Sequence, residues 1–175
     1  MSTYPTTPAQ GNRTGAAPVR PGTLKAAVLI AVVVGLAEVV NAVVMLTGGM
    51  DLAAKLAAKG LDILNLDLGA DLNNQVIKEA ATQMQSTLQG RAFILLVFGV
   101  GMLLFGLLMT KAATWARVLV TIFAALTLGM SGFVLLDVNT TLMMVLGAVA
   151  TLGAIVSIVT TWLGPNGRYA KALKA

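Results

Sequence analysis

Apolar side chains in this sequence are gathered into four long runs. Each run is close to the roughly 20 residues that an α-helix needs to cross a bilayer. The runs occupy residues 23–46, 92–109, 112–136 and 142–163. Because very few residues separate the last three runs, we expect these helices to be antiparallel neighbours. The pattern predicts an all-α polytopic membrane protein with four transmembrane helices.

The segment between the first two runs, residues 47–91, is too polar to span but is typical of helices. We expect Asp51 to cap a short helix that ends at Gly60, and a second helix to run from Asp71 to Gly90. One side of the second helix is apolar, with Val76, Ile77, Ala80, Ala81, Met84 and Leu88. The other side is polar, with Gln75, Lys78, Glu79, Gln85 and Ser86. The segment therefore predicts an amphipathic helical cap on the outer end of the bundle or at the lipid interface, with a ligand-binding loop as the alternative.

The two ends of the chain differ from the spans in composition. Residues 1–22 are rich in Pro, Gly and Thr and have no hydrophobic period, which predicts a disordered tail. Residues 164–175 form a basic tail. A cleaved signal peptide would have a shorter apolar region and a small-residue cleavage site, so we expect the first run to be retained as a helix.

Composition supports the bilayer as solvent and removes most catalytic chemistry. Charged residues make up 11% of the chain, against about 25% in a soluble domain, and the mean hydropathy is +0.86. The sequence has no Cys and no His, which removes disulfides, thiol nucleophiles and the commonest metal ligands. Asp62, Asp67 and Asp71 lack the spacing of a calcium loop. We expect no enzyme activity, no cofactor and no metal.

The basic residues indicate an orientation. They lie beside the apolar runs without the interleaved aromatic residues of a nucleic-acid surface, so we expect no nucleic-acid partner. Lys and Arg are retained on the cytoplasmic side of short loops, and this rule favours both termini inside. The inner side then holds Arg13, Arg20, Lys25, Lys111, Arg117, Arg168, Lys171 and Lys174, and the outer side holds Lys55, Lys59, Lys78 and Arg91. Trp115 and Trp162 fall at the inner ends of their spans, where indoles favour the headgroup level.

Glu38 is the candidate functional residue, because it lies well inside the first run. A carboxylate near the bilayer centre costs at least about 2.5 to 3.5 kcal/mol on insertion scales, so it needs a partner. Helical spacing places it on the side of the helix that carries small residues, which predicts that it faces protein. The candidate intramembrane polar site is formed by Glu38, Asn41, Thr127, Ser131 and Thr151. Arg117 lies too near the inner surface to pair with Glu38.

Two interpretations of Glu38 stay open. In the first, the side chain is neutral and fixes helix register through a hydrogen bond to Asn41 or a neighbouring hydroxyl. In the second, Glu38 handles protons or cations.

Three short motifs carry a resemblance to the small uncharacterised four-helix membrane proteins of actinobacteria. They are Arg20-Pro21-Gly22-Thr23, Trp115-Ala116-Arg117-Val118-Leu119 and Asn166-Gly167-Arg168-Tyr169. The resemblance implies a multi-pass protein of the bacterial inner membrane and no particular activity. The Ala37-Glu38-Val39 triplet also looks like the first helix of small multidrug exporters, whose glutamate binds both proton and cationic drug.

We therefore expect a non-enzymatic, envelope-associated or interaction protein, with a small proton-coupled transporter that uses Glu38 as the alternative. The expected partners are the lipid bilayer and a membrane protein or a second copy of the chain.

Overall fold

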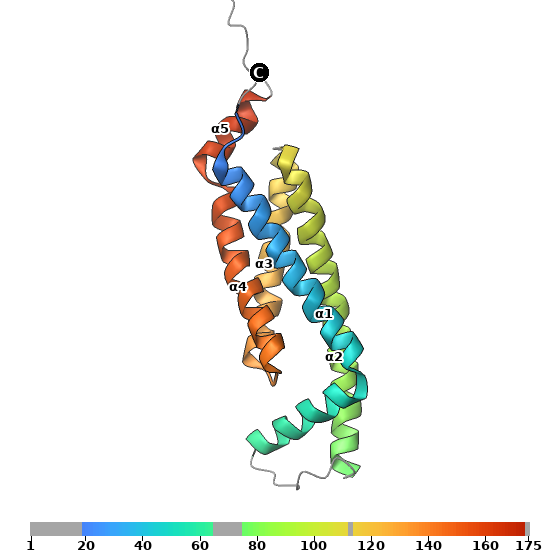
Figure 1. The fold of residues 1–175 in the computed structure, drawn as a ribbon. Coiled ribbons are helices and arrows are strands. Elements are labelled where there is room, and N and C mark those ends of the chain that lie inside the picture. The colour runs from blue at the N-terminus through green and yellow to red at the C-terminus, as the bar shows by residue number, and fades with distance from the viewer. Residues whose placement is uncertain (1–18, 65–74, 112–113, 174–175) are drawn as a thin grey trace, which may run out of the picture.

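The computed structural model describes residues 19–64, 75–111 and 114–173, and in them the chain is all-α (Figure 1). Four helices are long and apolar enough to cross a membrane. The elements are α1 (Gly22–Ile63), α2 (Gln75–Leu108), the 3-10 turn η1 (Met109–Lys111), α3 (Thr114–Leu136), α4 (Thr141–Thr161) and α5 (Gly164–Ala172). The predicted four-span helical protein is confirmed. Most of the N-terminal tail, and also Asp67 and Asp71, lie outside the described residues.

Helix α1 changes direction at Gly49. This residue has φ 52° and ψ −145°, a conformation that only glycine adopts readily. The apolar part of α1 ends here, as the sequence predicted, and residues 50–63 form a second helical stretch that we call the arm. The predicted stop at Gly60 is wrong, because the arm continues through that residue to Ile63.

Helix α2 is continuous through Gly90, so the predicted helix end at that residue is also wrong. One buried stripe passes from the polar half into the apolar half at intervals of three, four or seven residues. It consists of Ile77, Ala81, Leu88, Ala92, Leu95, Gly99, Met102 and Gly106. A single interior glycine costs a helix only about 1 kcal/mol relative to alanine. The burial of apolar residues along one face of α2, on both sides of Gly90, outweighs this cost.

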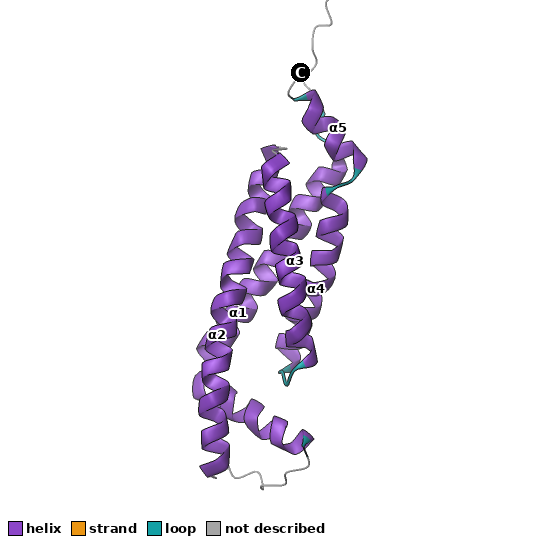
Figure 2. Ribbon diagram, turned by 180° about the vertical axis from the view of Figure 1, so that it is seen from behind, coloured by secondary structure: helices purple, strands orange, loops and turns teal. Residues whose placement is uncertain are grey.

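The four spans form a ring in which α1 packs against α2 and α4, and α3 packs against α4 and α2. Helices α1 and α3 therefore face each other across the ring, as the two views of Figures 1 and 2 show. Two apolar clusters fill the interior. One lies toward α5 and includes Leu24, Met102 and Val120; the other lies toward the arm and includes Leu56, Leu95 and Met143. Many large apolar side chains on the outer surface, such as Leu104, are exposed, as expected for a surface that faces lipid.

The C-terminal end carries an additional helix, α5, where the sequence predicted only a basic tail. Pro165 lies in its first turn, where a proline fits because that N–H has no partner inside the helix. The start of α1 lies at the same end of the bundle as α5 (Figure 1). At the other end, the arm and the first half of α2 extend beyond the loop between α3 and α4 (Figure 2).

Candidate functional site

Glu38 lies in the interior of the bundle, where its side chain is 1% exposed. The small residues that precede it on the same side of α1 are buried too, so the prediction that this side faces protein is confirmed. They are Ala27, Ala31 and Gly35. Along α1, Glu38 falls between the last residue of the apolar cluster toward α5, Val34, and the first residue of the cluster toward the arm, Ala42. A polar layer therefore separates the two apolar clusters.

One hydrogen bond crosses this polar layer. The Ser131 hydroxyl donates to Oε1 of Glu38, and both side chains are buried. Because α1 and α3 face each other across the ring, this bond joins opposite helices rather than adjacent ones. Of the hydroxyls that the sequence offered as partners, Ser131 is the one that pairs with the carboxyl.

The other oxygens of the predicted site are buried without a hydrogen-bond partner in the described residues. They are Glu38 Oε2, Asn41 Oδ1, Thr127 Oγ1 and Thr151 Oγ1. Asn41 and Thr127 are fully buried, whereas Thr151 is half-buried as a residue although its oxygen is covered. The structure therefore joins two of the five predicted residues directly and leaves the other three in the interior with unused hydrogen-bonding capacity.

Close packing surrounds the carboxyl. A Cβ added to Gly99 would lie 2.8 Å from the carbonyl oxygen of Gly35 and 3.0 Å from Cβ of Glu38. On α4, a Cβ added to Gly153 would lie 2.4 Å from Cγ2 of Val34. Helices approach this closely only where they carry glycine or other small residues. Three cavities of about 370, 250 and 290 Å³ lie elsewhere on the molecule, and Glu38 lines none of them.

Asn166 is the centre of a second polar cluster, which sequence reasoning missed. It is fully buried, and its Oδ1 accepts a hydrogen bond of 2.7 Å from the Thr23 hydroxyl. Its Nδ2 donates to the carbonyl of Thr160 at 2.9 Å, and its own carbonyl accepts from the Arg117 guanidinium. Thr23, Arg117 and Asn166 come from the three separate motifs that carried the resemblance to other four-helix proteins. The signal for this cluster was an asparagine one residue after Pro165.

Arg117 therefore has its partner at the α5 end of the bundle, away from Glu38. Its side chain is 4% exposed, and its Nε has no hydrogen-bond partner in the described residues. The expectation that it does not pair with Glu38 agrees with this position.

The loop between α3 and α4 is held from two sides. Arg91 on α2 forms an ion pair with Asp137, and Lys59 on the arm donates to the carbonyl of Asn139 at 2.9 Å. Partial burial on its own would raise the pKa of Asp137, but hydrogen bonds from Arg91 and from the Val138 N–H, together with the Arg91 charge, bring this pKa below its ordinary value. The arm and α2 are thus both fastened to the end of the bundle.

Comparison with protein-family models, with curated proteins and with solved structures found no match.

Proposed function

We propose that this chain is a non-enzymatic membrane protein that presents the segment at residues 47–91, which includes the arm and the first half of α2, as a contact surface for a partner in the cell envelope. The observation that carries the proposal is the continuity of α2. Its 34 residues correspond to about 51 Å of helix, whereas the hydrocarbon core of a bilayer is about 30 Å thick. A rod of this length that is anchored in the membrane projects well beyond it.

The projecting half of α2 is braced on one side and open on the other. The brace is the arm, whose buried Leu56 packs in the same apolar cluster as Leu88 of α2. The open side is polar and exposed, with Gln75, Lys78, Glu79, Thr82, Gln83 and Ser86. We call these six residues the polar face. A rigid polar surface of this kind binds a partner without first ordering a flexible loop, which lowers the entropic cost of association.

Photocrosslinking in living cells tests this role. A photoreactive amino acid replaces Gln83 or Glu79 on the polar face, and, as a matched control, the exposed and lipid-facing Leu104 of the same helix. We expect a discrete adduct from the two polar-face positions and none from position 104, with a second copy of this chain as one identifiable product. The same adducts from all three positions, or none from any, would contradict the proposal.

We place the protein in the bacterial inner membrane with both termini in the cytoplasm. This orientation is supported by the charges of the α5 end, which carries Arg20, Lys25, Arg168 and Lys171, while no acidic residue occurs before Glu38 or after Asp137 in the sequence. Basic residues favour the cytoplasmic side of a membrane.

The second candidate function is proton-coupled transport through Glu38. It is favoured by the buried Oε2 of this residue, which has no hydrogen-bond partner in the described residues. The close packing around Gly35 and Gly99 argues against this role, because transport needs a path to the carboxyl.

The Glu38→Gln variant separates the two functions, because an amide fills a similar volume but does not titrate. In proteoliposomes with an imposed pH gradient, we expect parent and variant to show the same cation flux as empty liposomes. A flux that depends on pH in the parent and is lost in Glu38→Gln would replace the contact-surface proposal with the transporter.

A further inference from the structure

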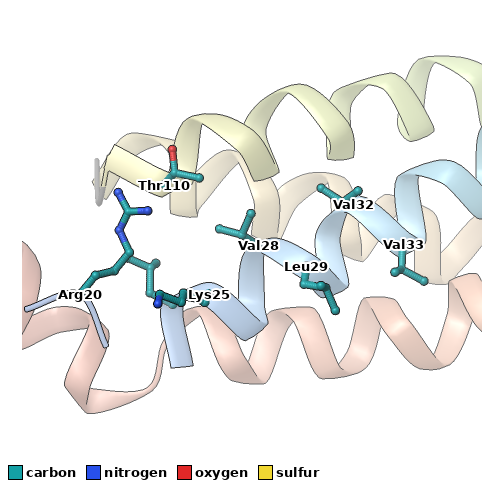
Figure 3. Close-up of a pocket in the computed structure, with 8 residues that line it drawn as sticks. Arg20, Lys25, Val28, Leu29, Val32, Val33 and Thr110 are labelled. Carbon is teal, nitrogen blue, oxygen red and sulfur yellow. The ribbon is translucent and has the colours of Figure 1, made fainter. Parts of the chain in front are cut away.

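A cavity of about 370 Å³ lies on the outer surface of α1 near the start of the helix. Its floor is apolar and is formed by consecutive turns of α1, with Val28, Leu29, Val32 and Val33. Figure 3 shows these side chains following one another along the helix, while Arg20, Lys25 and Thr110 lie together at one end. The cavity is therefore a groove that is apolar along the helix and basic at one end. We call the basic end, formed by Arg20 and Lys25, the basic mouth.

The basic mouth has no compensating negative charge. Within the described residues, neither Arg20 nor Lys25 forms an ion pair, and the one ion pair there joins Arg91 to Asp137. Every acidic residue of the sequence falls between Glu38 and Asp137, and none falls between residues 80 and 136. The α1 start, η1 and α5 together thus carry cations without carboxylate side chains, which favours an anionic ligand.

The apolar part of the groove has the position of a lipid chain. Leu29 and Val33 are 66% and 45% exposed, on the surface that faces the hydrocarbon of a bilayer. From Lys25 to Val33 the helix rises by about 12 Å, so the groove leads from the level of the basic residues into the membrane. A ligand that fills it must have a negative head and a long apolar chain.

We infer that this groove binds one anionic phospholipid, with its phosphate held by Arg20 and Lys25 and one acyl chain along Leu29 and Val33. A zwitterionic phospholipid has the same chain and the same phosphate, but it also carries an ammonium group that Arg20 and Lys25 repel. The site therefore discriminates by headgroup charge, and this inference does not depend on the proposed contact surface or on the orientation of the chain.

Native mass spectrometry of the full chain in detergent tests the inference. The protein is titrated with phosphatidylglycerol or with phosphatidylcholine of identical acyl chains, and the occupancy of the first bound lipid is measured. We expect phosphatidylglycerol to be preferred by a factor of about five or more. One basic residue near anionic lipid changes the affinity by a factor of this size. Equal occupancy by the two lipids would overturn the inference.

Two double variants show whether the preference belongs to this groove. Arg20→Gln with Lys25→Gln removes the basic mouth, whereas Arg168→Gln with Lys171→Gln removes the same charge from α5, where these two side chains line other cavities and not the groove. All four side chains are exposed, so both variants should fold. We expect the first pair to abolish the preference and the second to keep it. An equal loss in both would mean nonspecific attraction to the whole basic end.

The apolar part has its own test. Leu29→Trp fills the groove and should lower occupancy by phosphatidylglycerol, while Val156→Trp on the exposed surface of α4 should leave it unchanged. Soluble glycerol phosphate at the same concentration should not displace the bound lipid. Displacement by glycerol phosphate would show a phosphate site that does not use the groove, and this outcome would also overturn the inference.

Discussion

Gly35 of α1 and Gly99 of α2 lie against each other's backbone. A Cβ on Gly35 would lie 2.7 Å from the carbonyl oxygen of Gly99, and a Cβ on Gly99 would lie 2.8 Å from the carbonyl oxygen of Gly35. Both distances are shorter than real Cβ contacts. Side-chain atoms of Leu103 and Val39 lie almost equally close, but the backbone oxygens move only if the helices move. This pair sets how closely α1 and α2 approach beside Glu38.

Replacement of Gly99 by alanine tests this contact. The added methyl forces α1 and α2 apart, and we expect a loss of about 1–3 kcal/mol, the usual cost of overpacking a well-packed core. Thermal unfolding in detergent measures it. The control is Gly129→Ala, because Gly129 is exposed in α3 with nothing within 4 Å of its added Cβ. That variant should be neutral, or more stable by up to about 1 kcal/mol through helix propensity, and equal behaviour of both variants would exclude a specific contact.

The hydrogen bond from Ser131 to Glu38 has a measurable coupling. Removing one partner leaves the other buried without it, at a cost of about 1–3 kcal/mol, so Ser131→Ala and Glu38→Leu should each destabilise the fold. The double variant should cost less than the sum of the two, which a double-mutant cycle of thermal unfolding detects. Glu38→Gln keeps hydrogen-bonding capacity and should remain close to the parent. Strict additivity of the two losses would mean that the bond contributes nothing.

Two consecutive residues in the projecting half of α2, Ile77 and Lys78, lie on opposite faces of the helix. Ile77 is 2% exposed and Lys78 is exposed. Ile77→Asp places an unpaired carboxylate at a buried position, which costs several kcal/mol unless the segment opens, whereas Lys78→Asp places the same group in water. We expect faster hydrogen exchange in the arm and in residues 75–90 for Ile77→Asp alone. Similar exchange in both variants would show that the arm does not brace α2.

The ion pair of Asp137 with Arg91 gives a dependence on pH. The pKa of Asp137 is lowered in the folded protein, so its contribution is present above the unfolded pKa of about 3.9 and is lost as the pH falls through the lower folded value. Both side chains are partly exposed, which limits the contribution to at most about 1 kcal/mol.

Comparison with Asp137→Asn isolates this contribution. The difference in unfolding temperature between parent and variant should be present at neutral pH and should vanish as the pH falls below about 4. The exposed Asp62 supplies the control, since Asp62→Asn should show no such change between the two conditions. A difference for Asp137→Asn that persists unchanged at low pH would mean that its charge plays no part.

The proposed orientation is accessible to cysteine labelling, because the chain contains no native cysteine. In intact cells, a membrane-impermeant maleimide should label cysteines placed at Gln85 or Thr141. Cysteines at Ser2, Thr110 and Ala175 should be labelled only after the cells are permeabilised. The reverse pattern would invert the proposed topology.

The spans were predictable because burial in lipid requires long apolar runs, and the positions of Glu38 and Asn41 followed from the small residues on the same face of α1. The continuity of α2 through Gly90 was not predictable in this way. A glycine after a polar helix is a common stop signal. The helix continues here because the buried residues before and after Gly90, such as Leu88 and Ala92, lie on the same face of α2. That shared face depends on where the arm packs.

The polar clusters, too, were predictable from the sequence only in part. The sequence placed Ser131 and Thr127 at suitable depths for Glu38, but the choice between them depends on the rotation of α3, which its packing against α2 and α4 determines. Asn166 could not be assigned because its three partners, Thr23, Thr160 and Arg117, belong to three helices. Their meeting point exists only once the bundle and α5 are assembled.

Ser131 follows Glu38 by 93 residues in the sequence, so the two partners of this hydrogen bond are synthesised at different times. At a synthesis rate of about 5–20 residues per second, the first span leaves the ribosome roughly 5–20 s before Ser131 does. During this interval the carboxyl has no serine to bind, and Asn41, one turn along the same helix, is the nearest polar side chain that the nascent chain provides. The hydrogen bond of Glu38 therefore forms only when the third span arrives, so the final packing of the first span depends on a segment that is synthesised later.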